Sequence, residues 1–404
     1  MNLPLPNESG VPCILRVYSR NVELKTTDAI EVIGILSVDP QLACMFDEDT
    51  QIDSSERQEL EAHEPPPSLV PRLHALVTRR IHHNNPELCR NPASEKYKLD
   101  ISQLMQDAGS IYLELLSIFE HALLGDKLAA EYLLCNIVSN VYARADGLAL
   151  GKLCINISGC PLVQRYPALL HHLISQLVPQ SVLIDMSIDN MNTLRLIPSK
   201  DYNLNRLTAG MLQLAAGTHL VLNETALHQG QLSQTGVSNV KALADVISWQ
   251  RVEYDYQWHP IPIHTDLPVV VLSDGESLLP KDVHIPLVVT TDVVDMPEYF
   301  CKLDSRLTAE NLSKLRSYIT ACRLLDYSFS DELQKVIQED FVEIRQINPK
   351  DMTIDDFHRM LGLVRALTCS YGQSSPGIEM WVKVKTMEEA RKARIAGLPR
   401  THQP

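Results

Sequence analysis

The chain has 404 residues, 45% of them hydrophobic and 21% charged, and a formal net charge of −14 at pH 7. This length predicts two or three domains, with ample chain for a buried core. The negative charge argues against nonspecific binding to nucleic acid, which needs clustered Lys and Arg to neutralise phosphates. We therefore expect no direct nucleic-acid partner.

Targeting and redox signals are weak. The nine cysteines show no Cys-x-x-Cys spacing, which indicates reduced thiols of the cytosol or nucleus. The first twelve residues, MNLPLPNESGVP, lack the basic and apolar regions of a signal peptide. The most apolar helical stretch, 111–141, carries Glu114, Glu120 and Glu131, so it predicts a core helix and no membrane partner.

The N-terminal forty residues contain two strand-like runs, at 13–18 and 29–36. Two strands cannot bury a core alone, so we interpret 1–40 as a partial β segment. The next segment, 41–68, is acidic and ends in three prolines, which predicts a flexible linker. From 69 to 81 apolar residues recur at intervals of three and four, which predicts a helix.

Further helices are expected within 100–141, and β-branched runs then alternate with helical ones. This alternation predicts an α/β core over 69–295 with a largely parallel sheet. The strands expected after residue 150 are 153–157, 181–187, 193–197, 219–222, 267–273 and 283–289. The helices expected between them are 167–177, 205–214 and 237–249.

From residue 296 the strand-like runs stop, and 296–396 is expected to form a helical subdomain, followed by a tail at 397–404. Thr353 is expected to cap one of its helices, with Asp356 three residues later in a variant of the capping box. The helices expected are 312–325, 330–345, 354–369 and about 381–396. The basic residues after 381 fit an ordinary surface helix better than a nuclear import signal.

An α/β core followed by a helical lid is the plan of an AAA+ ATPase, which needs a phosphate loop of the form Gly-x4-Gly-Lys-Ser/Thr. The chain contains no match. Its one Gly-Lys pair, Gly151-Lys152, precedes a strand and not a helix. The nearest remnant, 123–133 (LLGDKLAAEYL), is expected to be uninterrupted helix.

The second motif of such an enzyme is an apolar strand that ends in Asp-Glu, which hold the hydrated magnesium and orient the attacking water. Residues 220–224 read LVLNE, so Asn223 replaces the aspartate while Glu224 remains. Ser273 and Arg365 stand where a sensor and a lid arginine could lie, but a turn residue and a surface charge are simpler interpretations. We interpret Asn223 and Glu224 as degenerate positions of the hydrolysis motif. We expect no catalytic residue and no cofactor, and an active ATPase with an unorthodox phosphate loop stays open as the alternative.

Other chemistries lack their motifs: the sequence has no Gly-x-Ser-x-Gly, Gly-x-Gly-x-x-Gly or His-Glu-x-x-His. The adjacent pairs His82-His83 and His171-His172 do not predict a metal site, because neighbours on a helix point about 100° apart.

Two blocks resemble the MCM replicative helicase subunits. LTAGMLQLAAGTHLVLNETALHQGQL (207–232) resembles their hydrolysis-motif segment, and the chain from LSKLRSYITACRLLDYS (312–328) to MTIDDFHRMLGLVRAL (352–367) resembles their lid. More closely, the chain is similar to the mini-chromosome maintenance complex-binding protein family. The segments that carry this similarity include EVIGILSVDP (31–40), PPPSLVPRLHALV (65–77), HALLGDKLAAEYLL (121–134), LGKLCINISGCP (150–161) and SFSDELQKVIQEDFVEIR (328–345).

The resemblance implies a degenerate AAA+-like (MCM-like) core with a C-terminal helical lid, preceded by a partial OB-like β segment. It also implies a nuclear, non-catalytic partner of the MCM helicase subunits. Members of the family support MCM assembly and dissociation from chromatin in DNA replication, and bear on sister-chromatid cohesion. Association with chromatin is expected through MCM. The family has a further N-terminal region, so we expect this sequence to be a fragment, a short isoform or an incomplete gene product.

Overall fold

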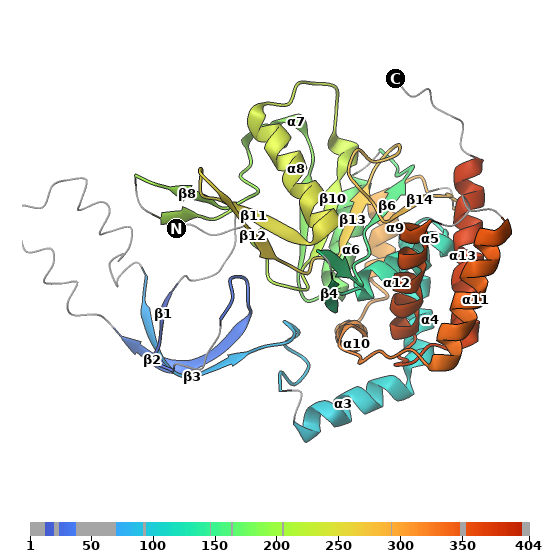
Figure 1. The fold of residues 1–404 in the computed structure, drawn as a ribbon, viewed down its shortest axis with the longest axis horizontal. Helices are drawn as coiled ribbons and strands as arrows, with labels where there is room; N and C mark the ends of the chain where they lie inside the picture. The colour runs from blue at the N-terminus through green and yellow to red at the C-terminus, as the bar shows by residue number, and fades with distance from the viewer. Residues whose placement is uncertain are drawn as a thin grey trace, which may run out of the picture.

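The structure, a computed structural model, describes residues 13–19, 24–37, 70–91, 94–145, 147–162, 165–203, 206–291, 293–347 and 353–397. The linker predicted over 41–68 and the tail residues 398–404 lie outside these ranges. The described chain is an α/β fold (Figure 1), as predicted, in which a parallel sheet lies between layers of helices.

A five-stranded, all-parallel sheet forms the centre of the molecule. It is built from β6 (Ile155–Ser158), β7 (Ser181–Asp185), β10 (His219–Asn223), β13 (Val269–Leu272) and β14 (Val283–Pro286). Their order across the sheet is β14-β6-β13-β10-β7. Apolar runs of this kind are typical of strands buried on both faces. The strands predicted at 153–157, 181–187, 219–222, 267–273 and 283–289 are confirmed.

Alternate residues of each central strand enter two different cores, because successive side chains of a strand point to opposite faces. Val221 packs in the larger cluster, whereas Leu220 and Leu222 pack in the smaller one. The larger cluster includes residues of α4 (Ala108–Ala122), α5 (Lys127–Val138) and α6 (Tyr166–Leu177). The smaller cluster includes residues of α7 (Ile188–Thr193) and α8 (Gln234–Trp249).

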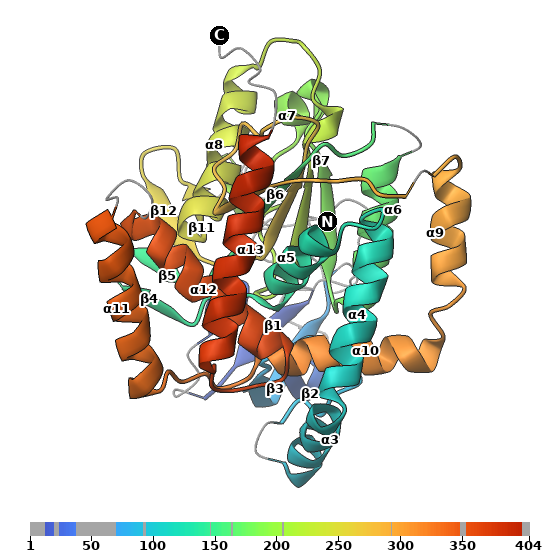
Figure 2. The same cartoon turned by 90° about the vertical axis from the view of Figure 1, so that its right-hand side faces the viewer.

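The C-terminal helices pack onto the larger core. Figure 2 shows them in front of the sheet, beside α4 and α5. They are α9 (Met296–Asp304), α10 (Ala309–Arg323), α11 (Asp331–Ile347), α12 (Ile354–Ser370) and α13 (Ile378–Ala396). The capping box predicted at the start of α12 is confirmed, because Thr353 and Asp356 each accept a hydrogen bond from the other's backbone N–H.

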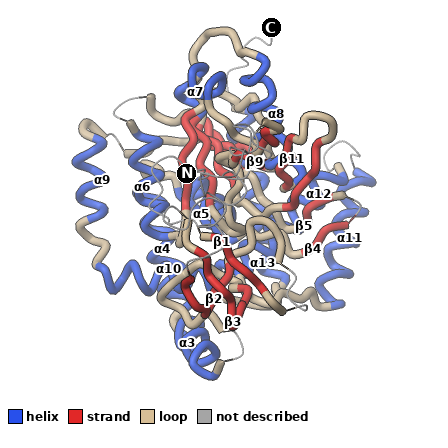
Figure 3. The backbone as a smooth tube through the Cα atoms, turned by 90° about the vertical axis from the view of Figure 1, so that its left-hand side faces the viewer, coloured by secondary structure: helices blue, strands red, loops and turns tan. Residues whose placement is uncertain are grey.

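The N-terminal strands form a separate three-stranded sheet (Figure 3). β1 (Ile14–Val17) and β2 (Ile30–Ser37) match the prediction, but the helix predicted over 69–81 is wrong, because β3 (Arg72–Arg80) is a strand. β3 pairs in parallel with β1 and antiparallel with β2, and this pairing on both edges overrides the weak local periodicity. After β3 the chain passes α3 (Glu95–Gln106) on its way to α4.

A four-stranded sheet projects from the molecule and contains two further corrections. It comprises β8 (Ser199–Asp201), β9 (Arg206–Thr208), β11 (Arg251–Asp255) and β12 (Pro260–His264), in the order β12-β11-β8-β9. The helix predicted over 205–214 is β9 followed by turns, and the strand predicted over 193–197 is the end of α7 and a loop.

Gly210 explains both errors. It lies so close to the backbone of Ile197 that an added Cβ would approach the Ile197 carbonyl carbon to 2.3 Å. Met211 and Leu212 donate backbone hydrogen bonds to Arg195 and Leu196. This close backbone approach needs glycine and replaces the helix.

Candidate functional site

The connections of the central sheet create a crevice between β6 and β13. α6 carries the chain from β6 to β7 at one edge, whereas the loop after β13 leads past β6 to β14 at the other edge. Parallel sheets bind ligands where neighbouring connections leave in opposite directions, outside the carboxyl ends of the strands. The candidate site therefore comprises the loops after β6 and β13, with the end of β10 beside them.

The loop after β6 has the strand–loop–helix order of a phosphate loop. Gly159 is followed, after four residues, by Gln164-Arg165-Tyr166, where an intact loop has Gly-Lys-Ser/Thr. Sequence reasoning missed this position because it required the Gly-Lys-Ser step itself. The available signal was a glycine directly after an apolar strand, with a helix beginning at Tyr166.

Backbone donors in this loop bond to protein. Gly159 donates its N–H to the Asp274 carbonyl at 2.8 Å, and Cys160 donates to the Ser273 carbonyl at 3.1 Å. In a phosphate loop such N–H groups cradle the phosphates. Here they join the loop after β6 to the loop after β13 and close the crevice between them.

Tyr166 occupies the position of the Ser/Thr that would serve magnesium. Its side chain is fully buried, and its hydroxyl donates to the Ala122 carbonyl at the end of α4, at 3.0 Å. Burial raises the pKa of this phenol well above its usual value. Tyr166 is therefore a neutral packing residue and does not offer an oxygen to a metal in the crevice.

Asn223 and Glu224, the predicted degenerate positions, lie at the carboxyl end of β10. Asn223 donates its amide to Asp185 Oδ1 at 2.6 Å and accepts a hydrogen bond from Thr225 Oγ1 at 2.6 Å. Glu224 is buried; it accepts from the Leu278 backbone N–H at 2.9 Å and from the hydroxyl of Ser277. Both side chains therefore hold protein groups in place, and Glu224 fixes the loop that follows β13.

The remaining predicted positions also have structural partners. Ser273 donates to the Gly275 carbonyl at 2.6 Å, as expected of a turn residue. The guanidinium of Arg365 lies 3.9 Å from the ring centroid of Tyr142, so it braces the lid against the core and is not a simple surface charge. Lys152, which precedes β6 as predicted, forms an ion pair with Asp282 at 2.5 Å.

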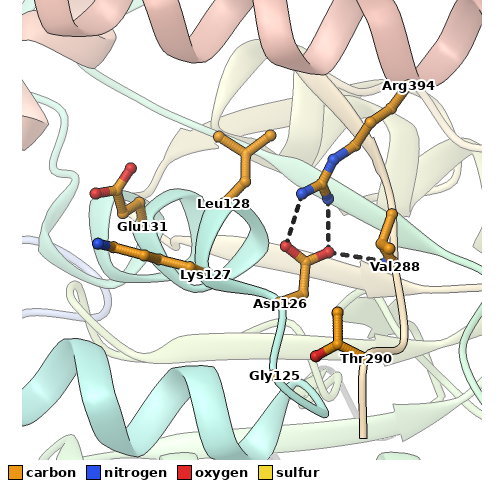
Figure 4. Close-up of a pocket in the computed structure, with 8 residues that line it drawn as sticks. All are labelled: Gly125, Asp126, Lys127, Leu128, Glu131, Val288, Thr290 and Arg394. Atoms are coloured by element: carbon orange, nitrogen blue, oxygen red, sulfur yellow. Dashed lines mark hydrogen bonds and ion pairs between the residues drawn. The ribbon is translucent and has the colours of Figure 1, made fainter.

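A cavity of about 420 Å³ opens beside the carboxyl end of β14, between Val288, Thr290 and the start of α5 (Figure 4). The uninterrupted helix predicted over 123–133 is wrong here. The chain turns between α4 and α5 through Gly125, whose φ is +88°, and Asp126 caps α5. The positive φ favours glycine at this turn.

Asp126 and Arg394 form the back of this cavity, as Figure 4 shows. Arg394, on α13, donates to both carboxylate oxygens of Asp126 at 2.6 and 3.0 Å, and the Val288 N–H adds a bond of 2.9 Å. The Asp126 carboxylate is fully buried. The guanidinium is thus neutralised by a carboxylate, and the cavity does not present it to an anionic ligand.

Two surveys cover the described part of the chain alone. Within it, no group of three or more His, Cys, Asp or Glu side chains is placed to hold a metal ion. No helix of that part is both long and apolar enough to cross a membrane.

The family model described as mini-chromosome maintenance replisome factor matches residues 1–395. The chain belongs to this family. A Gallus gallus relative named mini-chromosome maintenance complex-binding protein is 43% identical over 98% of this chain, which spans 64% of that relative. Relatives of the same name from Homo sapiens and Drosophila melanogaster are 41% and 34% identical, over 98% and 99% of this chain and 63% and 66% of their own lengths.

Membership in the mini-chromosome maintenance replisome factor family confirms the resemblance found in the sequence. The replisome-factor match covers the crevice loops, both sides of the Asp126–Arg394 pair and the four-stranded sheet. The chain spans less than two-thirds of the Gallus gallus and Homo sapiens relatives, so the activity of those whole proteins reaches this chain only as a proposal.

Proposed function

We propose that this chain is a non-catalytic binding partner of the MCM replicative helicase subunits. The family match over residues 1–395 supports this, as do the names of relatives from Gallus gallus and Homo sapiens, which state binding to the mini-chromosome maintenance complex. In this proposal the chain acts in the nucleus and supports assembly of the MCM complex and its dissociation from chromatin. Its effects on DNA replication and sister-chromatid cohesion follow from that binding, and it meets chromatin through MCM.

The proposal includes a degenerate AAA+-like core with a helical lid. Numbered by chain order within the central sheet, the strands lie in the order 5-1-4-3-2, and the lid helices follow the fifth strand. This order supports the proposal because AAA+ ATPases place their phosphate loop after the first strand and their hydrolysis acids after the third. The sheet β1-β3-β2 would be the partial OB-like segment.

One observation carries the non-catalytic part of the proposal: Gly159 and Cys160 donate their backbone N–H groups to Asp274 and Ser273. A nucleotide phosphate would have to break both bonds. Each buried carbonyl left without a partner costs about 1–3 kcal/mol. Arg165 and Tyr166 in place of Lys and Ser/Thr remove the cation and the hydroxyl that would offset this cost.

Direct binding tests the partnership. Purified chain immobilised on beads should capture purified MCM subunits in a fixed ratio. Val221→Asp, which places a carboxylate in the middle of buried β10, should unfold the core and abolish capture. Val237→Asp, at an exposed position of α8, is the matched control and should capture normally. Failure of the folded wild-type chain to capture any subunit would overturn the proposal.

The alternative is an active AAA+-type ATPase with an unorthodox phosphate loop. Isothermal titration of the purified chain with ATP, with and without magnesium, separates the two. We expect no heat of binding in either case. Magnesium-dependent binding in the micromolar range would overturn the non-catalytic assignment.

A further inference from the structure

The tips of two hairpins project together from the four-stranded sheet, away from the central sheet (Figure 1). One tip joins β8 to β9 and the other joins β11 to β12. Tyr202 in the first tip donates its hydroxyl to the Tyr256 carbonyl in the second at 2.8 Å. This bond makes the two tips one structural unit.

The tip between β11 and β12 is held in a strained turn. Gln257 has a φ of +61°, which is uncommon for a residue other than glycine. Trp258 donates its N–H to the Tyr256 carbonyl at 2.7 Å, which closes a three-residue turn, and the Asp255 carboxylate accepts from the Gln257 N–H at 2.7 Å. Such strain costs about 1–3 kcal/mol and clusters at binding sites.

The strained turn presents aromatic side chains to solvent. Trp258 is 84% exposed and Tyr202 is 47% exposed. The ring of His259 stacks on Tyr256, with centroids 5.8 Å apart, and Ile261 continues the apolar surface along β12. We call Tyr202, Tyr256, Trp258, His259 and Ile261 the aromatic tip. Tryptophan and tyrosine dominate the hot spots of protein interfaces, where they fill desolvated pockets.

The charges near the aromatic tip favour a protein over a nucleic acid. Single strands also stack on aromatic rings, but they require a positively charged groove for their phosphates. Asp201 and Asp255 stand at the bases of the two tips, and Arg251 and Lys241 on the adjoining surface both form ion pairs with Glu253. Carboxylates at this position repel phosphates and complement a basic rim around an apolar pocket.

We propose that the aromatic tip, centred on Trp258, anchors this chain in an apolar pocket with a basic rim on an MCM subunit. This inference rests on the proposed function, because it names the surface through which that binding occurs.

The affinity of purified MCM subunits for Trp258→Ala tests the inference. Loss of a hot-spot tryptophan weakens binding by about 30-fold or more, and Trp258→Phe should recover part of that loss. Leu278→Ala, at another strongly exposed apolar side chain on the loop after β13, is the matched control and should leave the affinity within about twofold. Thermal unfolding of all three variants should match that of the wild type, because both side chains face solvent.

Fluorescence supplies a second readout. Of the three tryptophans, Trp381 is buried, Trp249 is 40% exposed and Trp258 is the most exposed. Docking should therefore shift the emission of the wild-type chain to shorter wavelength, and Trp258→Phe should remove most of that shift.

The possible results separate the two proposals. If the wild-type chain does not bind MCM subunits, the proposed function fails. If it binds and Trp258→Ala binds equally well, the aromatic tip is not the anchor, while the proposed function stands. Salt-sensitive binding of a labelled single-stranded oligonucleotide that disappears in Trp258→Ala would overturn the assignment of a protein partner.

Discussion

Asn223 links neighbouring strands through its amide group. The amide donates to Asp185 at the end of β7, 2.6 Å away. Asn223→Asp would replace this hydrogen bond by two facing carboxylates, and like charges at this distance oppose ionisation of both. We expect no ATPase activity from the variant and a loss of about 1–3 kcal/mol in the free energy of unfolding, measured by urea denaturation at pH 7.

The exchanged pair is the control for that substitution. In Asp185→Asn combined with Asn223→Asp, one amide again meets one carboxylate, so most of the lost stability should return. If Asn223→Asp alone is as stable as the wild type, the strand link is unimportant.

His219 is a buried neutral imidazole. The Asn136 amide donates to the carbonyls of Leu153 and Val269, so its oxygen accepts from His219 Nε2 at 2.9 Å. The other ring nitrogen, Nδ1, has no hydrogen-bond partner. Burial and the positive charge of Arg323 lower the pKa of His219 to about 3.

This lowered pKa makes folding sensitive to acid. Between pH 6.5 and about 3 the unfolded chain binds a proton at His219 that the folded chain excludes, so stability falls as pH decreases through this window. We expect His219 to account for about 2 kcal/mol of lost stability between pH 7 and 5. Parallel denaturation of His219→Gln, which cannot take up the proton, should show a decrease smaller by this amount. Equal decreases in both proteins would contradict the assignment.

At the scale of elements, α13 is fixed to the core by buried ion pairs. Arg394 holds Asp126 at the start of α5, and Arg391 and Arg359 both contact Glu388. Burial opposes ionisation of Glu388, but the hydrogen bond from Arg391 and the charges of Arg359 and Arg391 lower its pKa overall. These contacts hold the last helix against β14.

Arg394→Ala should therefore be costly. Removing one partner of a buried pair leaves an uncompensated charge and costs about 3–5 kcal/mol. Lys302→Ala breaks the surface pair with Glu298, whose partners are 69% and 62% exposed, and should cost less than about 1 kcal/mol. Chemical denaturation of both variants checks the contrast, and similar losses in the two would contradict a special role for α13.

Elements buried on both faces were predictable from the sequence, whereas elements defined by their partners were not. The apolar run at 219–222 identifies β10 by itself, and with it Asn223 and Glu224. The positions of Leu73, Leu76 and Val77 suit a helix as well as a strand, and only pairing with β1 and β2 decides between them. The crevice loop at Gly159 was missed for the same reason, since its place depends on the order of strands far apart in the sequence.

At the scale of the whole molecule, the core and the lid share one hydrophobic cluster. It contains Val221 and Val270 of the sheet together with Val364 of α12 and Trp381 of α13. Separate unfolding of the lid would expose half of this cluster. We expect residues 94–397 to unfold in a single cooperative transition, with equal calorimetric and van't Hoff enthalpies. Two resolved transitions, one of them moved by Arg394→Ala alone, would show an independent lid.

The hydrogen bonds from Gly159 and Cys160 to the loop after β13 have a consequence for timing. A helicase subunit changes its contacts as its nucleotide is consumed, but in the proposed function this chain responds to neither ATP nor its products. Its hold on a partner would be the same when the cell's adenylate pool is full and when it is depleted. Release would then depend on competitors for the same surface, on covalent modification, or on changes in the partner itself.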